Sequence, residues 1–100
     1  MMFDFSEDTL AYILKYYGSP VVKYKRFGPI NGIDFGIGSF ALEDGRCFFV
    51  CSTHLDAAVF QTTKYIDEED CIPDISSTGR RIFRDRMTNE VLDEKYVGCI

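Results

Sequence analysis

The feature that most constrains the fold is an Asp-Gly pair between two apolar runs. Residues 33–42 form an extended apolar stretch, Asp44-Gly45 follows within a short polar turn, and residues 47–52 form a second apolar stretch. Asp-Gly is a preferred pair for the two-residue type I′ turn of a β-hairpin, because both residues tolerate positive φ. The sequence therefore predicts a hairpin over 33–52.

This turn would also set the pairing of the two strands. With the Asp-Gly pair at its centre, Leu42 would face Cys47 and Phe40 would face Phe49. One face would then carry Phe40, Leu42, Cys47, Phe49 and Cys51, and the other Ile37, Ala41, Phe48 and Val50. Because both faces are apolar, we expect both to be covered, either within the chain or by another subunit.

A helix is predicted near the N-terminus. Ser6 is a good N-cap residue, and Glu7 and Asp8 suit the positive end of the helix dipole. An apolar stripe at helical spacing follows: Leu10, Ile13, Leu14 and Tyr17. Gly18 and Pro20 then favour the end of the helix.

The remaining segments give weaker signals. Residues 21–27 alternate as a strand does, with Val22 and Tyr24 on the face opposite Lys23 and Lys25. Residues 53–66 favour a short helix through Leu55, Ala58 and Val59 that gives way to a strand, with a strand alone as the alternative.

The C-terminal third is predicted as a loop followed by a hairpin. Residues 67–79 are polar and rich in turn formers, which indicates an exposed loop. Residues 80–86 and 90–97 suggest a closing hairpin that turns at Met87-Thr88-Asn89, with Asn89 at positive φ. A helix over 89–96 is the alternative.

Together these elements predict the α+β class. We expect the N-terminal helix to pack on an antiparallel sheet of four to six strands, with the 33–52 hairpin at its centre. One hundred residues correspond to one domain, so 1–100 is predicted to be a single α+β domain. The apolar fraction of 46% is enough for a core without disulfides.

No catalytic or metal-binding constellation is evident. Cys47, Cys51 and His54 could supply ligands to zinc with Cys71 or Cys99. Cys47 and Cys51 would lie roughly 13 Å apart on one strand, which is too far for one ion. A Cys51–His54 dyad would lack an orienting group. We therefore expect no enzyme activity, metal or cofactor, and we interpret the cysteines as core residues.

The most distinctive feature of the C-terminal half is a separation of charge. Five acids precede four arginines: Asp67, Glu68, Glu69, Asp70 and Asp74, then Arg80, Arg81, Arg84 and Arg86. These nine residues are the candidate partner-binding residues, since both charge runs can steer association with a protein. The bland alternative is that the acidic run is a solvated loop, and another is that the arginines fold back and pair with the acids.

These patterns favour a non-enzymatic protein-binding module of the inhibitor or immunity type, such as a viral or mobile-element accessory protein. It would occupy an unidentified protein partner through the acidic loop and an apolar sheet face, and homo-oligomers would be compatible with it. A structural subunit of a virion-like assembly is the alternative, and a small nucleic-acid-binding protein comes third, because a net charge of −5 disfavours nucleic acid. The acidic N-terminus and the lack of an apolar run of about 20 residues predict a cytoplasmic protein without membrane contact.

Overall fold

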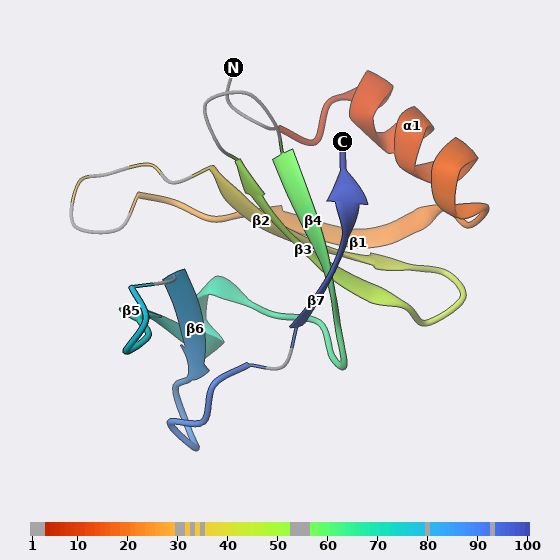
Figure 1. Ribbon diagram of the computed structural model, residues 1–100. Helices are drawn as coiled ribbons and strands as arrows, with labels where there is room; N and C mark the ends of the chain where they lie inside the picture. Colours follow the sequence, from red (N-terminus) through yellow and green to blue (C-terminus); the bar gives the residue numbers. More distant parts are fainter. Residues whose placement is uncertain are drawn as a thin grey trace.

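The computed structural model describes residues 4–29, 32, 34, 36–52, 57–79, 81–92 and 94–100. Within these residues the chain forms three layers: a helix, a five-stranded antiparallel sheet and a two-stranded sheet (Figure 1). The α+β class predicted from the sequence is confirmed, including the helix on an antiparallel sheet.

The elements follow one another with short connections. Their bounds are α1 (Glu7–Tyr17), β1 (Val21–Arg26), β2 (Ile37–Leu42), β3 (Cys47–Ser52), β4 (Ala57–Thr62), the 3₁₀ helix η1 (Glu68–Asp70), β5 (Cys71–Ile75), β6 (Arg81–Asp85) and β7 (Glu94–Cys99). The large sheet has the order β1-β2-β3-β4-β7, and β5 pairs with β6. The hairpin β2–β3 therefore lies at the centre of the large sheet, as predicted.

The register of this hairpin differs from the prediction by one residue. Ala41 pairs with Cys47 and Phe40 pairs with Phe48, so the predicted Phe40–Phe49 pair is wrong. The connection is a three-residue loop, in which Gly45 has a φ of 96° and its N–H donates to the carbonyl of residue 42. This G1-bulge arrangement replaces the two-residue type I′ turn. A one-residue slip moves every side chain of one strand to the other face.

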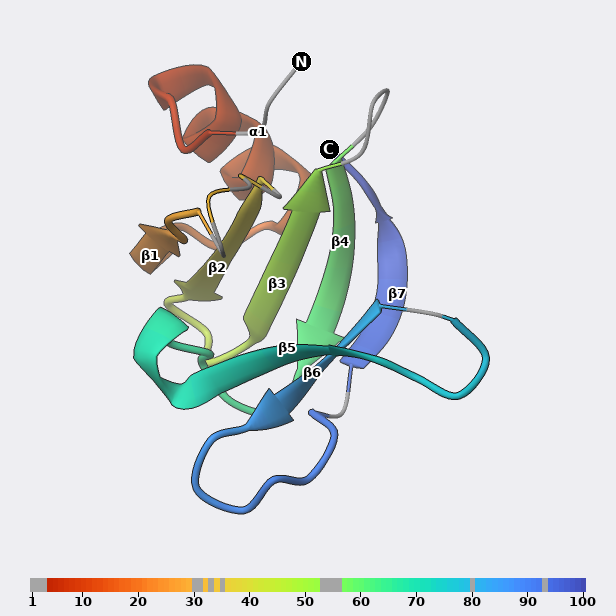
Figure 2. The ribbon, with the colours of Figure 1, turned by 90° about the vertical axis from the view of Figure 1, so that its left-hand side faces the viewer.

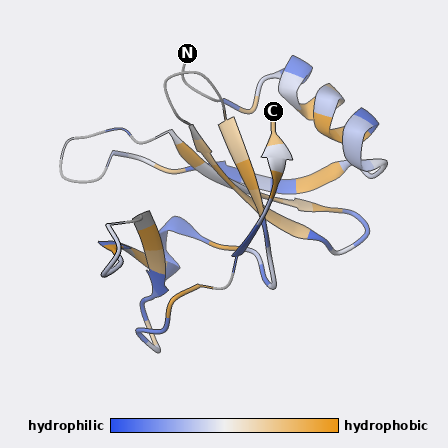
Figure 3. Ribbon diagram, in the orientation of Figure 1, coloured by the Kyte–Doolittle hydropathy of each residue, from blue (hydrophilic) through white to orange (hydrophobic). Residues whose placement is uncertain are grey.

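Both faces of the central hairpin are apolar and both are covered within the chain. Between α1 and the large sheet lie Ile13, Phe40, Leu42, Phe48, Val50, Ala57 and Val59. Between the large sheet and the β5–β6 sheet lie Phe27, Ile37, Phe49, Ile66, Cys71 and Phe83. Figure 2 shows the β5–β6 sheet crossing in front of the large sheet, and Figure 3 shows that hydrophobic residues concentrate in the central strands.

The helix forms as the sequence predicts, but it buries a narrower stripe. The Ser6 side chain accepts from the Thr9 N–H (3.2 Å), and Gly18 ends the helix at a φ of 73°. Ile13 is fully buried, whereas Leu14 is 47% exposed although the pattern placed it in the core. The helix therefore rests on the sheet along the line of Ile13 and leaves much of its surface to solvent.

The second half of the chain differs from the prediction in two places and agrees with it in a third. Ala58 and Val59 belong to β4, so a helix reaching them is wrong, while the rest of that predicted helix, 53–56, lies outside the described residues. The predicted loop over 67–79 contains η1 and β5. The strand over 80–86 exists as β6, and Asn89 has the expected positive φ of 61°.

The closing hairpin is only partly correct. Arg84 forms an isolated bridge with Val91, but β6 otherwise pairs with β5 rather than with 90–97. The last segment continues as β7, which pairs with β4 and excludes the alternative helix.

The two edge strands of the large sheet are both irregular. In β1 the register shifts between Val21 and Lys23, and in β7 Val97 has no residue opposite it on β4. Lys23 and Lys95 are exposed on these strands. Bulges and lysines at sheet edges discourage further strands from pairing there.

Candidate protein-binding surface at the acidic turn

The acidic turn, residues 67–70, is a rigid feature at the start of the β5–β6 sheet. The carboxylate of Asp67 accepts from the Glu69 N–H (3.3 Å), which starts the 3₁₀ helix. This hydrogen bond is the main reason that the pKa of Asp67 lies below its ordinary value. Just upstream, the buried Ser39 hydroxyl donates to the Ile66 carbonyl (2.5 Å) and fixes the approach to the turn.

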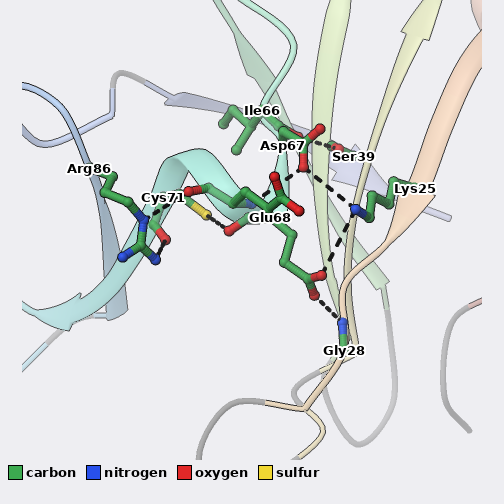
Figure 4. A network of polar contacts seen from close by, with 9 residues as sticks. Lys25, Gly28, Ser39, Ile66, Asp67, Glu68, Cys71 and Arg86 are labelled. Atoms are coloured by element: carbon green, nitrogen blue, oxygen red, sulfur yellow. Dashed lines mark hydrogen bonds and ion pairs between the residues drawn. The ribbon is translucent and has the colours of Figure 1, made fainter.

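Two of the four acids in the turn hold it against β1. The ammonium group of Lys25 lies 3.6 Å from a carboxylate oxygen of Asp67 and 4.0 Å from one of Glu68. Glu68 also accepts a hydrogen bond from the Gly28 N–H. Figure 4 shows how these contacts join the turn to the strand beneath it. Asp67 and Glu68 therefore serve the fold.

Arg84 on β6 and Arg86 just after it also fold back onto the acidic segment. Arg84 donates from Nε to Asp74 (2.8 Å) and holds the pKa of Asp74 below its ordinary value. Arg86 donates from Nε to the Glu69 carbonyl (2.8 Å) and from Nη2 to the Cys71 carbonyl (3.3 Å). Among the described residues one ion pair, Arg84–Asp74, joins the two charge runs, while Arg86 binds backbone carbonyls of the acidic segment. The predicted pairing of arginines with acids is therefore found at a single acid.

For two predicted site arginines, the structure does not describe the side chain. Arg80 lies outside the described residues, and Arg81 is placed only by its backbone, which pairs with Ile75.

What remains on this surface is negative charge. Glu69 and Asp70 are exposed, and no described residue forms an ion pair with either carboxylate. The nearby Lys64 is already paired with Asp85 at 2.7 Å. The acidic turn therefore presents two carboxylates that form no ion pair within the described part of the chain, on a backbone that is held at several points.

Sequence reasoning found the acids of this surface but missed the residues that hold them. Lys25 pairs with Asp67 and Glu68, and Lys64 pairs with Asp85 on β6, but neither lysine was among the candidate site residues. The alternation in 21–27 did place Lys25 on one face of a strand. Only the topology shows that this face lies beneath the acidic turn.

Two of the cysteines, Cys47 and Cys71, have thiols with a higher pKa than an ordinary thiol. Burial raises the pKa of the Cys71 thiol to about 11, and it also raises the pKa of Cys47. A neutral thiol is a poor nucleophile and a poor metal ligand. Within the described residues no group of three His, Cys, Asp or Glu side chains is placed to hold a metal ion, and His54 lies outside them.

Comparison with known proteins gives no further guide to the site. No family model matches the chain, and neither a curated protein nor a solved structure matches it. Among the described residues no helix has the length and hydropathy needed to span a membrane.

Proposed function

We propose that this chain is a non-enzymatic protein-binding module that captures a basic protein partner, in the manner of an inhibitor or immunity protein. The observation that carries the proposal is the charge left on the acidic turn after the internal pairs are formed. Glu69 and Asp70 project from an anchored backbone, and a preformed surface loses little conformational entropy on binding.

The proposed partner-binding surface is the acidic turn rather than a face of the large sheet. Both apolar faces of the central hairpin are covered by the chain itself. Arg84 is engaged with Asp74 and Arg86 with backbone carbonyls, which leaves both less available to phosphates. Together with the net charge of −5, this favours a basic protein over nucleic acid.

An assembly subunit that extends its sheet from copy to copy is less well supported. Bulges and exposed lysines lie on both edge strands, and these features discourage edge-to-edge pairing. We therefore favour capture of a separate partner.

The test reverses the two carboxylates that the fold does not use. A tagged chain is used to capture proteins from a lysate of its native cell, and the captured proteins are identified by mass spectrometry. The Glu69→Lys/Asp70→Lys variant should lose the partner and keep the melting temperature, because neither carboxylate is in an internal ion pair.

The matched control reverses two exposed acids on other loops, Glu43→Lys and Glu90→Lys, which changes the net charge equally. This control should still capture the partner. Capture that survives in the Glu69/Asp70 variant would contradict the assignment to the acidic turn. Loss of capture in the control as well would show that only the net charge matters.

A further inference from the structure

The exposed side chains on the outer face of α1 follow an order along the helix that would complement a second, antiparallel copy of the same face. Helical geometry places Asp8, Ala11 and Lys15 on the side opposite the buried Ile13, with Tyr12 at the edge of the same face. All four outer residues are exposed. Read along the helix, the face is acidic, then small, then aromatic, then basic.

This face has unused apolar surface. Tyr12 is 42% exposed, and its ring stacks on that of Tyr16, which is 59% exposed, at a centroid distance of 5.7 Å and an angle of 10°. A shallow hollow is lined by Tyr12, Lys15 and Tyr16. Figure 1 shows that α1 lies on the side of the large sheet away from β5 and β6, so nothing in the described chain covers its outer face.

The charges on this face are also unused. Asp8 and Lys15 are seven residues apart, about 10 Å along the helix axis, so they cannot pair with each other. No ion pair joins either of them to another described residue.

We propose that a second copy of the chain packs its α1 antiparallel against this face, about a twofold axis. Asp8 of each copy then meets Lys15 of the other, and Tyr12 of each copy lies over Ala11 of the other. Each contact occurs twice, as in any isologous interface. The small Ala11 lets the opposing ring approach, and Asp8 enters the hollow beside Lys15.

The antiparallel arrangement is the one that the charges select. In a parallel pair Asp8 would face Asp8 and Lys15 would face Lys15, which is repulsive. The antiparallel pair also places the positive N-terminus of each helix beside the negative C-terminus of the other. The acidic turn lies on the opposite side of the molecule and stays accessible in both copies (Figure 1).

The dimer should be weak and reversible. An eleven-residue helix is only about 16 Å long, and its face is smaller than the roughly 800 Å² per partner of a standard interface. Sedimentation velocity over a wide range of concentrations should show a rise from 11.5 kDa toward twice that mass.

Charge reversal provides the decisive measurement. Asp8→Lys and Lys15→Asp should each weaken the dimer about tenfold or more, because each replaces two attractive pairs by two repulsive ones. The double variant Asp8→Lys/Lys15→Asp exchanges the charges and should restore the association. A matched set at exposed positions outside α1, Glu90→Lys, Lys95→Asp and their combination, should leave it unchanged.

Asp8 lies in the first turn of α1, so its reversal also tests the fold. A second variant, Tyr12→Ser, keeps the helix dipole intact and should abolish association by removing the ring. A wild-type chain that stays monomeric at every concentration would overturn the proposal. So would a charge-exchanged double variant that folds, by circular dichroism, without regaining the dimer.

Discussion

Gly38, the second residue of β2, shows how a missing side chain organises the packing around it. A Cβ atom at this position would lie 2.9 Å from the ring of Phe5 and 3.2 Å from the carbonyl oxygen of Lys25. The space is taken by Phe5, whose ring lies 4.8 Å from that of Tyr24 and 6.1 Å from that of Phe40. The segment before α1 is therefore fastened to the sheet through this slot.

We predict that Gly38→Ala lowers the free energy of unfolding by about 1 to 3 kcal/mol, the usual cost of overpacking a filled site. Urea denaturation followed by circular dichroism measures this cost. The same substitution in a Phe5→Ala background should cost clearly less, because the clashing ring is gone. Equal costs in both backgrounds would show that Phe5 does not occupy the slot.

The four free cysteines should differ widely in reactivity. Cys71 is 4% exposed and burial raises its pKa to about 11, whereas Cys99 is exposed. With iodoacetamide at pH 8, we expect Cys99 to be alkylated first and Cys71 last, as followed by peptide mass spectrometry. In denaturant the rates should converge. Modification of Cys71 as fast as Cys99 in the folded chain would contradict the packing of the second core, which lies between the large sheet and the β5–β6 sheet.

At the scale of elements, the β5–β6 sheet acts as the cover of the second core. Phe83 on β6 is 2% exposed, and its ring lies 4.8 Å from that of Phe49 on β3 in an edge-on arrangement. This ring contact joins the small sheet to a core that also contains Phe27, Ile37, Ile66 and Cys71.

Phe83→Ala should therefore lower the free energy of unfolding by about 3 to 5 kcal/mol, as for other buried phenylalanines. Hydrogen exchange should show the greatest loss of protection in β5 and β6. Met87→Ala, at a side chain 88% exposed in the following turn, is the control and should have little effect. A small effect of Phe83→Ala with unchanged exchange would mean that the cover is held by other contacts.

The elements that sequence could predict are those with local signals. Capping at Ser6 and Gly18 predicts α1, and the apolar runs around residue 45 predict the central hairpin. The register failed because Asp-Gly is compatible with both a two-residue and a three-residue loop. Strand β5 was missed because it includes Pro73 and Asp74 and is stabilised by β6 rather than by its own pattern.

The candidate site was predictable to a similar extent. The separation of acids and arginines between 67 and 86 is visible in the sequence, and so is the alternative that they pair. Which acids remain free depends on Lys25, which comes from a strand more than forty residues earlier. A contact of that kind follows from the topology, and no local pattern contains it.

For the whole molecule, stability should be highest between mildly acidic and neutral pH. Burial raises the pKa of Cys71 from 9.0 to about 11 and that of Tyr17 from 10.0 to about 12. The unfolded chain loses these protons first, so stability falls as the pH rises above about 9. Melting temperatures measured from pH 7 to 11 check this, and Cys71→Ala should make the decline shallower.

At low pH the relevant groups are aspartates, and stability falls as the pH decreases. Hydrogen bonds and ion pairs lower the pKa of five aspartates below the ordinary 3.8: Asp34, Asp44, Asp67, Asp74 and Asp85. Their contribution is complete above that value and is lost as the pH falls through the folded-state values. Melting temperatures should therefore drop below about pH 4. The drop should be smaller in 0.5 M salt, because screening weakens the same ion pairs at neutral pH. A flat profile from pH 6 to 2 would contradict these contacts.

The position of β7 has a consequence for how the chain acquires its structure. Thr62 on β4 pairs with Glu94 on β7, 32 positions later, and an entire small sheet is formed between them. During synthesis of the intervening residues, the edge of β4 that later pairs with β7 has no partner strand. Its backbone N–H and C=O groups are then open to pairing with another chain. Because this pairing joins distant parts of the chain, we expect the large sheet to be completed late in folding, after β5 and β6 have been made.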